Sequence, residues 1–152
     1  FRGGKAGTYE GGHRVPFIAT WPGALPAGRV THAPISLVDL LPTLATRAGT
    51  AERVPAGIDG VDVWSELAGT GTLPERALLY DNQGKAEAIR LGPWKLRVTV
   101  EGSASSASQP AGERVELFHL LRDPSERYDR AVAEPAVVKQ LRARLAAENA
   151  RK

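Results

Sequence analysis

The sequence predicts a partial α/β fold, in which the end of a larger α/β domain is followed by a small four-stranded antiparallel sheet and a C-terminal helix. An apolar run, Val15–Trp21, is bounded by glycine and proline, which is typical of a strand buried on both faces of a sheet. After Pro74 the pattern changes to short extended runs, and the chain ends with apolar residues at helical spacing. We therefore expect two parts, residues 1–73 and residues 74–152.

Composition excludes several classes of function. The 152 residues include 20 lysines and arginines and 17 aspartates and glutamates, which gives a net charge of +3. These charges are interleaved, and no dense basic patch with stacking aromatic residues is present, so a nucleic-acid partner is not expected. No apolar run is long enough to span a membrane. The absence of cysteine excludes disulfides and thiolate metal sites.

In the first part, we expect a strand from Pro16 to Trp21 and then a loop rich in proline and glycine. A helix over roughly Leu40–Ala48 follows. Asp39 is its expected N-cap, because this places Pro42 in the first turn, where a missing N–H is tolerated. Gly49 suits the left-handed residue that ends a helix.

In the second part, Gly92-Pro93 marks a turn between two extended runs, which favours an antiparallel sheet. The small, polar segment Glu101–Gly112 is expected to form a mobile hairpin loop. Helical spacing over Glu134–Asn149, with Pro135 in the first turn, predicts a helix that buries an apolar stripe. The four expected strands are Ala77–Asp81, Glu87–Leu91, Trp94–Val100 and Arg114–Leu120, and the stripe consists of Val137, Val138, Leu141 and Leu145.

A glycine-rich loop carrying one lysine precedes the first apolar run. Glycines crowd around Lys5 and Glu10 between Gly3 and Gly12, and glycine is required where a backbone turns tightly or approaches a ligand closely. A loop at the end of such a strand is where α/β proteins usually bind ligands. Lys5 is therefore the first candidate for a binding or catalytic residue.

The segment GGKAGTYEGGHRVPFIATWPG closely resembles the lysine-containing signature of the type I sulfatases, the arylsulfatase family of the alkaline-phosphatase-like superfamily. Thr31–Ala45 resembles the helix that follows in this family, and Gly57–Asp62 resembles its next turn. Glu116–Leu120 and Asp123–Glu126 are similar to the family's last strand and the acidic turn after it. The order and spacing of these pieces cover nearly the whole chain.

The resemblance implies hydrolysis of a sulfate monoester, carried by a small molecule or a glycan, in which Lys5 contacts the sulfate and stabilises charge in the transition state. It also implies a formylglycine nucleophile, made from a Cys/Ser-x-Pro-x-Arg motif, and a Ca²⁺ or Mg²⁺ ion. This sequence lacks that motif and the family's metal-binding aspartates, so we expect a C-terminal portion of a sulfatase that is inactive alone. Residues 1–73 would then end the catalytic domain. The full-length protein is expected to be periplasmic or secreted.

Other polar residues receive more modest roles. Thr8, Glu10 and Arg14 are expected to support the loop, with Glu10 and Arg14 as an ion pair, and His13 is expected to pack. The turn that contains Asn82, Gln83 and Lys85 is interpreted either as part of a substrate rim or as an ordinary exposed hairpin. His32 and His119 have no second ligand at metal-binding spacing.

Two alternatives to a sulfatase remain at this point. The chain could belong to a phosphate or phosphonate ester hydrolase of the same superfamily, because the scaffold supports both reactions. It could also be a non-catalytic binding or assembly module that uses the small sheet.

Overall fold

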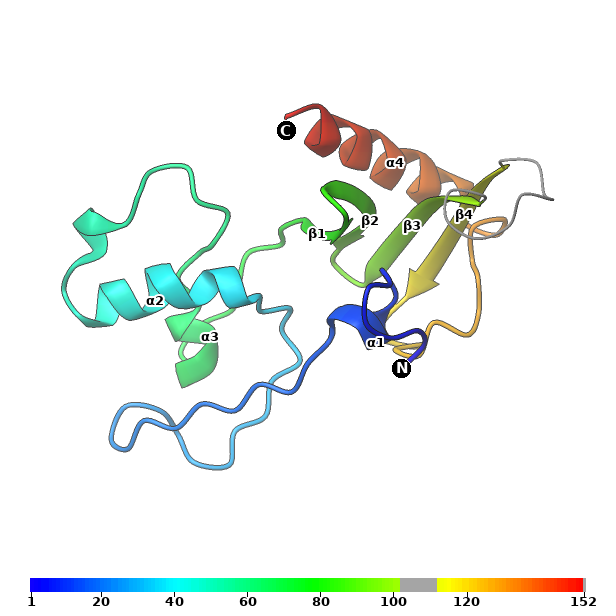
Figure 1. Ribbon diagram of the computed structural model, residues 1–152. Coiled ribbons are helices and arrows are strands. Elements are labelled where there is room, and N and C mark those ends of the chain that lie inside the picture. The colour runs from blue at the N-terminus through cyan, green and yellow to red at the C-terminus, as the bar shows by residue number, and fades with distance from the viewer. Residues whose placement is uncertain (102–111, 152) are drawn as a thin grey trace. The chain divides into compact units, whose positions relative to one another are not determined.

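The computed structural model describes residues 1–101 and 112–151, so most of the predicted mobile loop Glu101–Gly112 lies outside the described residues. The chain divides into two compact units (Figure 1). One unit combines Phe1–Pro16 with Glu75–Lys152, and the other is Phe17–Pro74. The chain therefore leaves the first unit after 16 residues and returns to it at Glu75. The domain boundary between residues 73 and 74 stays a prediction.

A four-stranded antiparallel sheet in the order β1-β2-β3-β4 forms the centre of the first unit. The strands are β1 Leu78–Asn82, β2 Lys85–Leu91, β3 Trp94–Glu101 and β4 Gly112–His119. All four predicted strands are thus confirmed. Gly92 has a φ of +55° in the turn between β2 and β3, a conformation that glycine adopts without strain.

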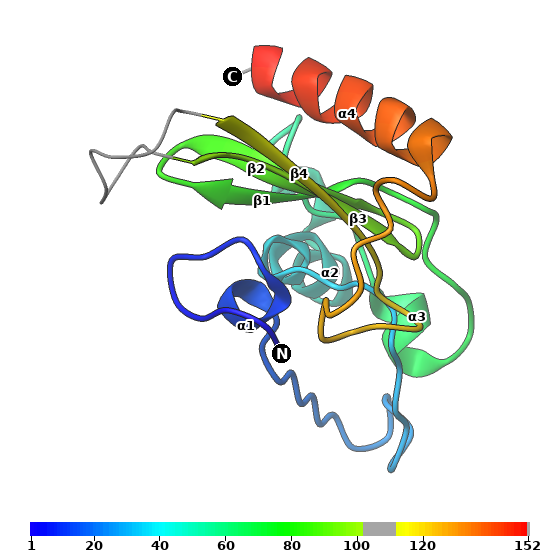
Figure 2. The same ribbon diagram turned by 90° about the vertical axis from the view of Figure 1, so that its right-hand side faces the viewer.

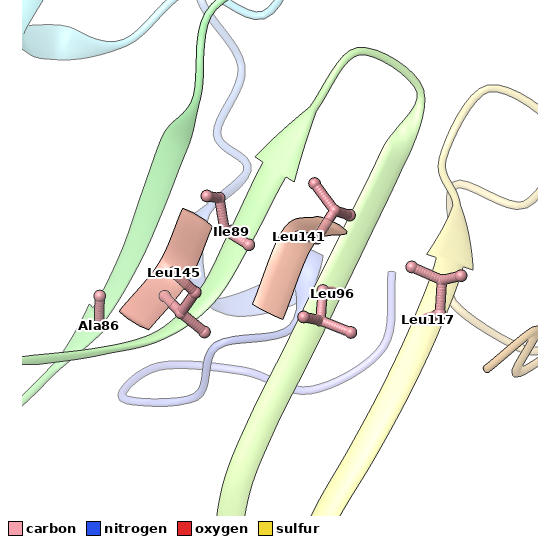
Figure 3. Packing of buried hydrophobic residues seen from close by; sticks show 6 residues of the cluster. All are labelled: Ala86, Ile89, Leu96, Leu117, Leu141 and Leu145. Atoms are coloured by element: carbon pink, nitrogen blue, oxygen red, sulfur yellow. The ribbon is translucent and has the colours of Figure 1, made fainter. Parts of the chain in front are cut away.

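The helix α4, Pro135–Ala150, packs on one face of this sheet and confirms the predicted C-terminal helix. Leu141 and Leu145 are buried over side chains of three strands (Figure 3). The pairing of β1 with β2 shifts between Tyr80 and Asp81, which indicates a β-bulge. A bulge changes which residues of a strand share a face. The residues that pack with Leu141 and Leu145 are Ala86, Ile89, Leu96 and Leu117.

The opposite face of the sheet carries charged residues and is covered by the N-terminal segment. Side chains alternate between the faces of a strand, so Lys95 and Arg97 of β3 point away from the apolar cluster to which Leu96 belongs. The helical turn α1, Glu10–His13, and the loop before it lie against this second face, with α4 on the other side (Figure 2).

The second unit contains short helices joined by long loops. They are η1 Leu37–Asp39, α2 Leu40–Arg47, η2 Ala51–Arg53 and α3 Trp64–Ala68. Asp39 occupies the N-cap position of α2 as predicted, but its side chain makes no capping hydrogen bond to that helix. Its buried carboxylate accepts hydrogen bonds from the Ser36 and Val61 N–H groups at 2.7 and 3.1 Å. Gly49 follows the helix with a φ of +67°, which confirms its predicted left-handed conformation.

The predicted strand Pro16–Trp21 is wrong for this structure. These residues form no strand and are exposed, and Ile18 retains 90% of its accessible surface. A strand requires a neighbour that takes up its N–H and C=O groups. No strand among the described residues pairs with this segment. The apolar pattern alone does not supply that neighbour.

Among the described residues, no helix combines the length and apolar character that crossing a membrane requires.

The core between α4 and the sheet can be tested at Leu141, which is only 2% exposed. We expect Leu141→Ala to lower the free energy of unfolding by about 2–5 kcal/mol, because it removes buried methyl groups and leaves a cavity. Gln140→Ala, at the exposed neighbouring position, is the control and should change it by about 0.5 kcal/mol or less. Urea unfolding followed by circular dichroism measures both, and equal effects would contradict this packing.

Candidate functional site

The glycine-rich loop closes on itself through backbone hydrogen bonds and presents Lys5 at its surface. The Gly7 N–H donates to the Gly4 carbonyl at 3.0 Å, and the Gly11 N–H donates to the Arg2 carbonyl at 2.8 Å. Lys5 lies within the first of these turns and is exposed. Its neighbour Ala6 has a φ of +68°, a left-handed conformation that costs a non-glycine residue about 1 kcal/mol or more. The backbone of the loop therefore has a defined conformation, with local strain at Ala6.

Gly11 and Gly12 leave no room for a side chain. A Cβ on Gly11 would lie 2.5 Å from the carbonyl oxygens of both Arg2 and Gly3. A Cβ on Gly12 would overlap the Gly7 carbonyl oxygen. The loop backbone lies so close to α1 that only glycine, which has no Cβ, fits at these two positions.

A fully buried lysine joins α1 to the sheet. Lys95 is 0% exposed, and its Nζ lies 2.9 Å from Glu10 Oε1 and 2.9 Å from Glu126 Oε1. The Tyr80 hydroxyl also donates to Glu10 Oε1 at 3.1 Å, and Lys95 Nζ lies 3.9 Å from the centre of the Tyr80 ring. We call Lys95, Glu10 and Glu126 the buried ion cluster. Its members come from β3, α1 and the acidic turn after β4.

Glu126 reaches this cluster from a strained backbone. It has a φ of +55° and is fully buried, and its carboxylate accepts the Glu10 backbone N–H at 2.6 Å. The Asp123 carboxylate closes the turn by accepting the N–H groups of Arg127 and Tyr128 at 2.7 and 2.8 Å. Burial raises the pKa of Glu126, although the Glu10 N–H and Lys95 act in the opposite direction. This turn is therefore shaped to present one carboxylate to α1.

A second charged cluster holds the residues just before α1. Arg97 Nε donates to Thr8 Oγ1 at 2.9 Å, and the same guanidinium donates to Glu116 at 2.8 Å. The Tyr9 hydroxyl donates to Glu116 at 2.6 Å, while the Tyr9 ring lies 4.1 Å from the Arg97 guanidinium and 4.2 Å from that of Arg2. Thr8 is buried. The neighbouring side chains of Thr8 and Tyr9 are thus both fixed on the sheet by Arg97 and Glu116.

The predicted rim residues lie in the hairpin between β1 and β2. Gln83 and Gly84 have φ angles of +53° and +86°, as a type I′ turn requires. Asn82 donates to Glu87 at 3.1 Å, and Glu87 accepts the Thr8 hydroxyl at 3.4 Å. Asn82 is thus linked to the loop through one side chain. Gln83 and Lys85 are exposed on the hairpin.

The remaining predicted residues surround Glu10. Arg14 lies 3.8 Å from the Glu10 carboxylate, and its guanidinium stacks 4.8 Å from the centre of the Phe1 ring. The His13 ring meets Tyr80 edge to face at 5.1 Å. Burial and the nearby Lys95 lower the pKa of His13. The structure therefore brings Thr8, Glu10 and Arg14 to one side of the sheet, while Lys5 is exposed.

Sequence reasoning missed the residues that anchor the loop. Lys95 and Arg97 alternate with apolar residues along β3, a pattern that places two cations on one face of the sheet. This alternation could have indicated a charged face of the sheet, but it does not identify the residues that pair with Lys95 and Arg97. The other missed residues are Arg2, Tyr9, Tyr80, Glu116 and Glu126.

The residues described by the structure do not fit a metal site. Among residues 1–101 and 112–151, no group of three or more histidine, aspartate or glutamate side chains converges as metal ligands. The buried carboxylates of Glu10 and Glu126 share the Lys95 ammonium instead.

Comparisons with known proteins give the family. The family model described as Sulfatase matches residues 1–50. Arylsulfatase A of Homo sapiens is 38% identical over 93% of this chain, and the chain spans 31% of that relative's length. A structure from the study of glycosaminoglycan metabolism by Bacteroides thetaiotaomicron matches 99% of this chain and 32% of its own, with a TM-score of 0.79 and 27% identity. The structure of Ps i-CgsB in complex with k-i-k-neocarrahexaose matches 97% of this chain and 31% of its own, with a TM-score of 0.73 and 28% identity.

Fold and loop thus define the class as part of an α/β protein of the alkaline-phosphatase-like superfamily. Within that class the chain belongs to the sulfatase family and corresponds to a C-terminal portion of a sulfatase. The expected family and the expected partial fold are both confirmed. The chain spans less than a third of the relative and of the two structures.

The tight packing of Gly12 can be tested against Gly4, which has nothing within 4 Å of an added Cβ. We expect Gly12→Ala to displace the loop and speed amide hydrogen exchange over residues 3–12 by about tenfold or more, since the new methyl group meets backbone. Gly4→Ala should leave this exchange unchanged. Equal exchange in the two variants would contradict the observed loop path.

Glu116 predicts a pH dependence of stability. Burial tends to raise its pKa, but hydrogen bonds from Tyr9 and Arg97 and the charges of Arg114 and Arg2 outweigh burial and lower it. The folded pKa lies below the unfolded value of 4.5, so Glu116 stabilises the fold above that pH. This contribution is lost as the pH falls through the folded pKa.

We expect Glu116→Gln to be less stable than the parent protein at pH 7 by about 1–3 kcal/mol, and to lose less further stability as the pH falls from about 5 to 3. Urea unfolding at a series of pH values measures this. Glu52→Gln is the control, because the Glu52 side chain is 69% exposed. Parallel pH profiles for Glu116→Gln and the parent protein would show that the carboxylate has no such role.

Proposed function

We propose that the full-length protein containing this chain is a sulfuric ester hydrolase, and that Lys5 is the residue of this chain that contacts the sulfate ester. The observation that carries the proposal is the exposed lysine on a strained, glycine-packed loop that buried charges anchor to the sheet. The sulfatase names of the relatives support sulfate over phosphate or phosphonate, and support an enzyme over a non-catalytic module.

Lys5 would act through its charge and position. In sulfate ester hydrolysis, negative charge gathers on the sulfuryl oxygens and the leaving oxygen. An ammonium held within hydrogen-bonding reach of these oxygens stabilises that charge without reorganisation during the reaction. The anchored loop would keep the ammonium in place, and its exposure leaves it accessible to a ligand. Lys5 is thus an electrostatic stabiliser and not a nucleophile.

The loop and the hairpin would have different roles. Thr8, Glu10 and Arg14 would support the loop, since Thr8 and Glu10 contact residues of β3 and Arg14 pairs with Glu10. Asn82, Gln83 and Lys85 would contact the organic part of the substrate. A sulfated glycan fits polar groups of this kind. One structural neighbour comes from a study of glycosaminoglycan metabolism, and another is in complex with k-i-k-neocarrahexaose.

The nucleophile and the metal ion would come from other parts of the full-length protein. This sequence contains no Cys/Ser-x-Pro-x-Arg motif, and its described residues form no metal site. A formylglycine and a Ca²⁺ or Mg²⁺ ion therefore belong to the proposal for the whole enzyme. By itself, the 152-residue chain would bind at most the anion and would not hydrolyse the ester.

The proposal is tested by Lys5→Ala in the full-length protein, with an aryl sulfate and sulfated oligosaccharides as substrates. We expect kcat to fall about a hundredfold or more, because the lost ammonium stabilises the transition state. Lys139→Ala, on the exposed side of α4, is the matched control and should retain kcat. Sulfate release that is unaffected by Lys5→Ala, or turnover by the purified 152-residue chain, would contradict the proposal.

A further inference from the structure

Two members of the buried ion cluster, Lys95 and Glu126, have no contact with solvent, and they lie on β3 and on the acidic turn after β4 and not on the loop that carries Lys5. Lys95 and Glu126 are each 0% exposed, and Glu10 is 2% exposed. Lys95 is 85 positions from Glu10, and Glu126 is 116 positions from it. Charged side chains are rarely buried unless they are paired. The cluster therefore forms only when the loop, β3 and the acidic turn come together.

We propose that Lys95 and Glu126 are positioning residues for Lys5: they bind Glu10 from β3 and from the acidic turn after β4, and so fix the loop from Gly3 to Gly12 in the conformation that presents the Lys5 ammonium to the substrate. This inference rests on the proposed function, because it assigns Lys5 to the sulfate ester. Neither residue touches the reacting atoms. Each acts through the backbone that carries Lys5.

The geometry of Glu10 supports this role. Lys95 holds its carboxylate at 2.9 Å, and Glu126 holds its backbone N–H at 2.6 Å, so both ends of the residue are fixed at once. Glu10 begins α1, and the Arg14 N–H donates back to the Glu10 carbonyl at 2.7 Å. The loop that carries Lys5 is joined directly to this turn through Tyr9. A shift of α1 therefore shifts the loop.

Two features support a role of the cluster in holding the backbone of the loop and of the acidic turn. Glu126 keeps a left-handed backbone at φ +55°, and such a conformation persists where surrounding contacts hold it. Arg2 donates to the Glu126 carbonyl at 3.2 Å, so the turn contacts the chain on both sides of the loop. The charged side chain that faces the cluster is Arg14, at 3.8 Å from Glu10. The Tyr80 hydroxyl donates to Glu10, and the His13 ring packs against the Tyr80 ring.

The first experiment measures the loop without any substrate. In the full-length protein, Lys95→Met removes the ammonium but keeps a long apolar side chain. We expect amide hydrogen exchange of Gly7, Gly11 and Gly12 to accelerate about tenfold or more while the amides of α4 keep their protection, because the change releases the loop locally. Glu126→Gln is a milder second variant and should accelerate the same amides to a smaller extent. Arg142→Met, which breaks the exposed Arg142–Glu113 pair, is the control and should leave them unchanged.

The second experiment is a double-mutant cycle in sulfate ester hydrolysis. If Lys95 acts through Lys5, Lys95→Met should lower kcat by about tenfold or more in the parent enzyme, with a smaller change in KM, and should have little further effect in a Lys5→Ala background. A role in general stability would lower activity to the same extent in both backgrounds.

The two experiments separate this inference from the proposed function. Unchanged loop exchange in folded Lys95→Met and Glu126→Gln would overturn the positioning role, whatever the activity. Additive effects of Lys95→Met and Lys5→Ala would also overturn it. A full-length protein that releases no sulfate would contradict the proposed function, while the exchange experiment would still decide whether the cluster holds the loop.

Discussion

The ammonium of Lys95 is buried without access to water, and this single requirement organises the first unit. A buried charge needs partners, and removing one partner of a buried ion pair costs about 3–5 kcal/mol. Glu10 and Glu126 meet the requirement from opposite ends of the chain, both at 2.9 Å. Residues 1–16 therefore belong to the same unit as the sheet, although 58 residues of the other unit, Phe17–Pro74, separate them from it in sequence.

The two faces of the sheet make different kinds of contact. Leu141 and Leu145 of α4 bury apolar surface, and such packing is strong but not directional. The other face uses ion pairs and hydrogen bonds, which fix distance and direction. If the loop presents Lys5 to a substrate as proposed, the second kind of contact suits it better, because it fixes the position of the backbone. The helix supplies stability to the sheet, and the charged face supplies orientation to the loop.

Local sequence signals predicted the elements well, and distant partners could not be predicted from them. Strands, turns and α4 were predicted because alternation, Gly92 and helical spacing act within a few residues. Lys95 and Arg97 alternate along β3, yet nothing near them in sequence indicates that Glu10 and Glu116 are their partners. The same limit explains the wrong strand at Pro16–Trp21, since apolar residues predict burial but a strand exists only with a neighbour.

The residues that anchor the loop differ from the residue proposed to contact the substrate, and the contacts of the loop show this difference. Thr8 and Glu10 are buried and committed to the sheet, whereas Lys5 is exposed beside the strained residue Ala6. Strain of this kind is retained only where other contacts determine the backbone, and the two charged clusters provide those contacts. A catalytic ammonium is most effective when its position is set before the substrate arrives. In the proposed function, the position of the Lys5 ammonium would be set by buried side chains of the two charged clusters, and the exposed Lys5 side chain would be left to interact with an anion.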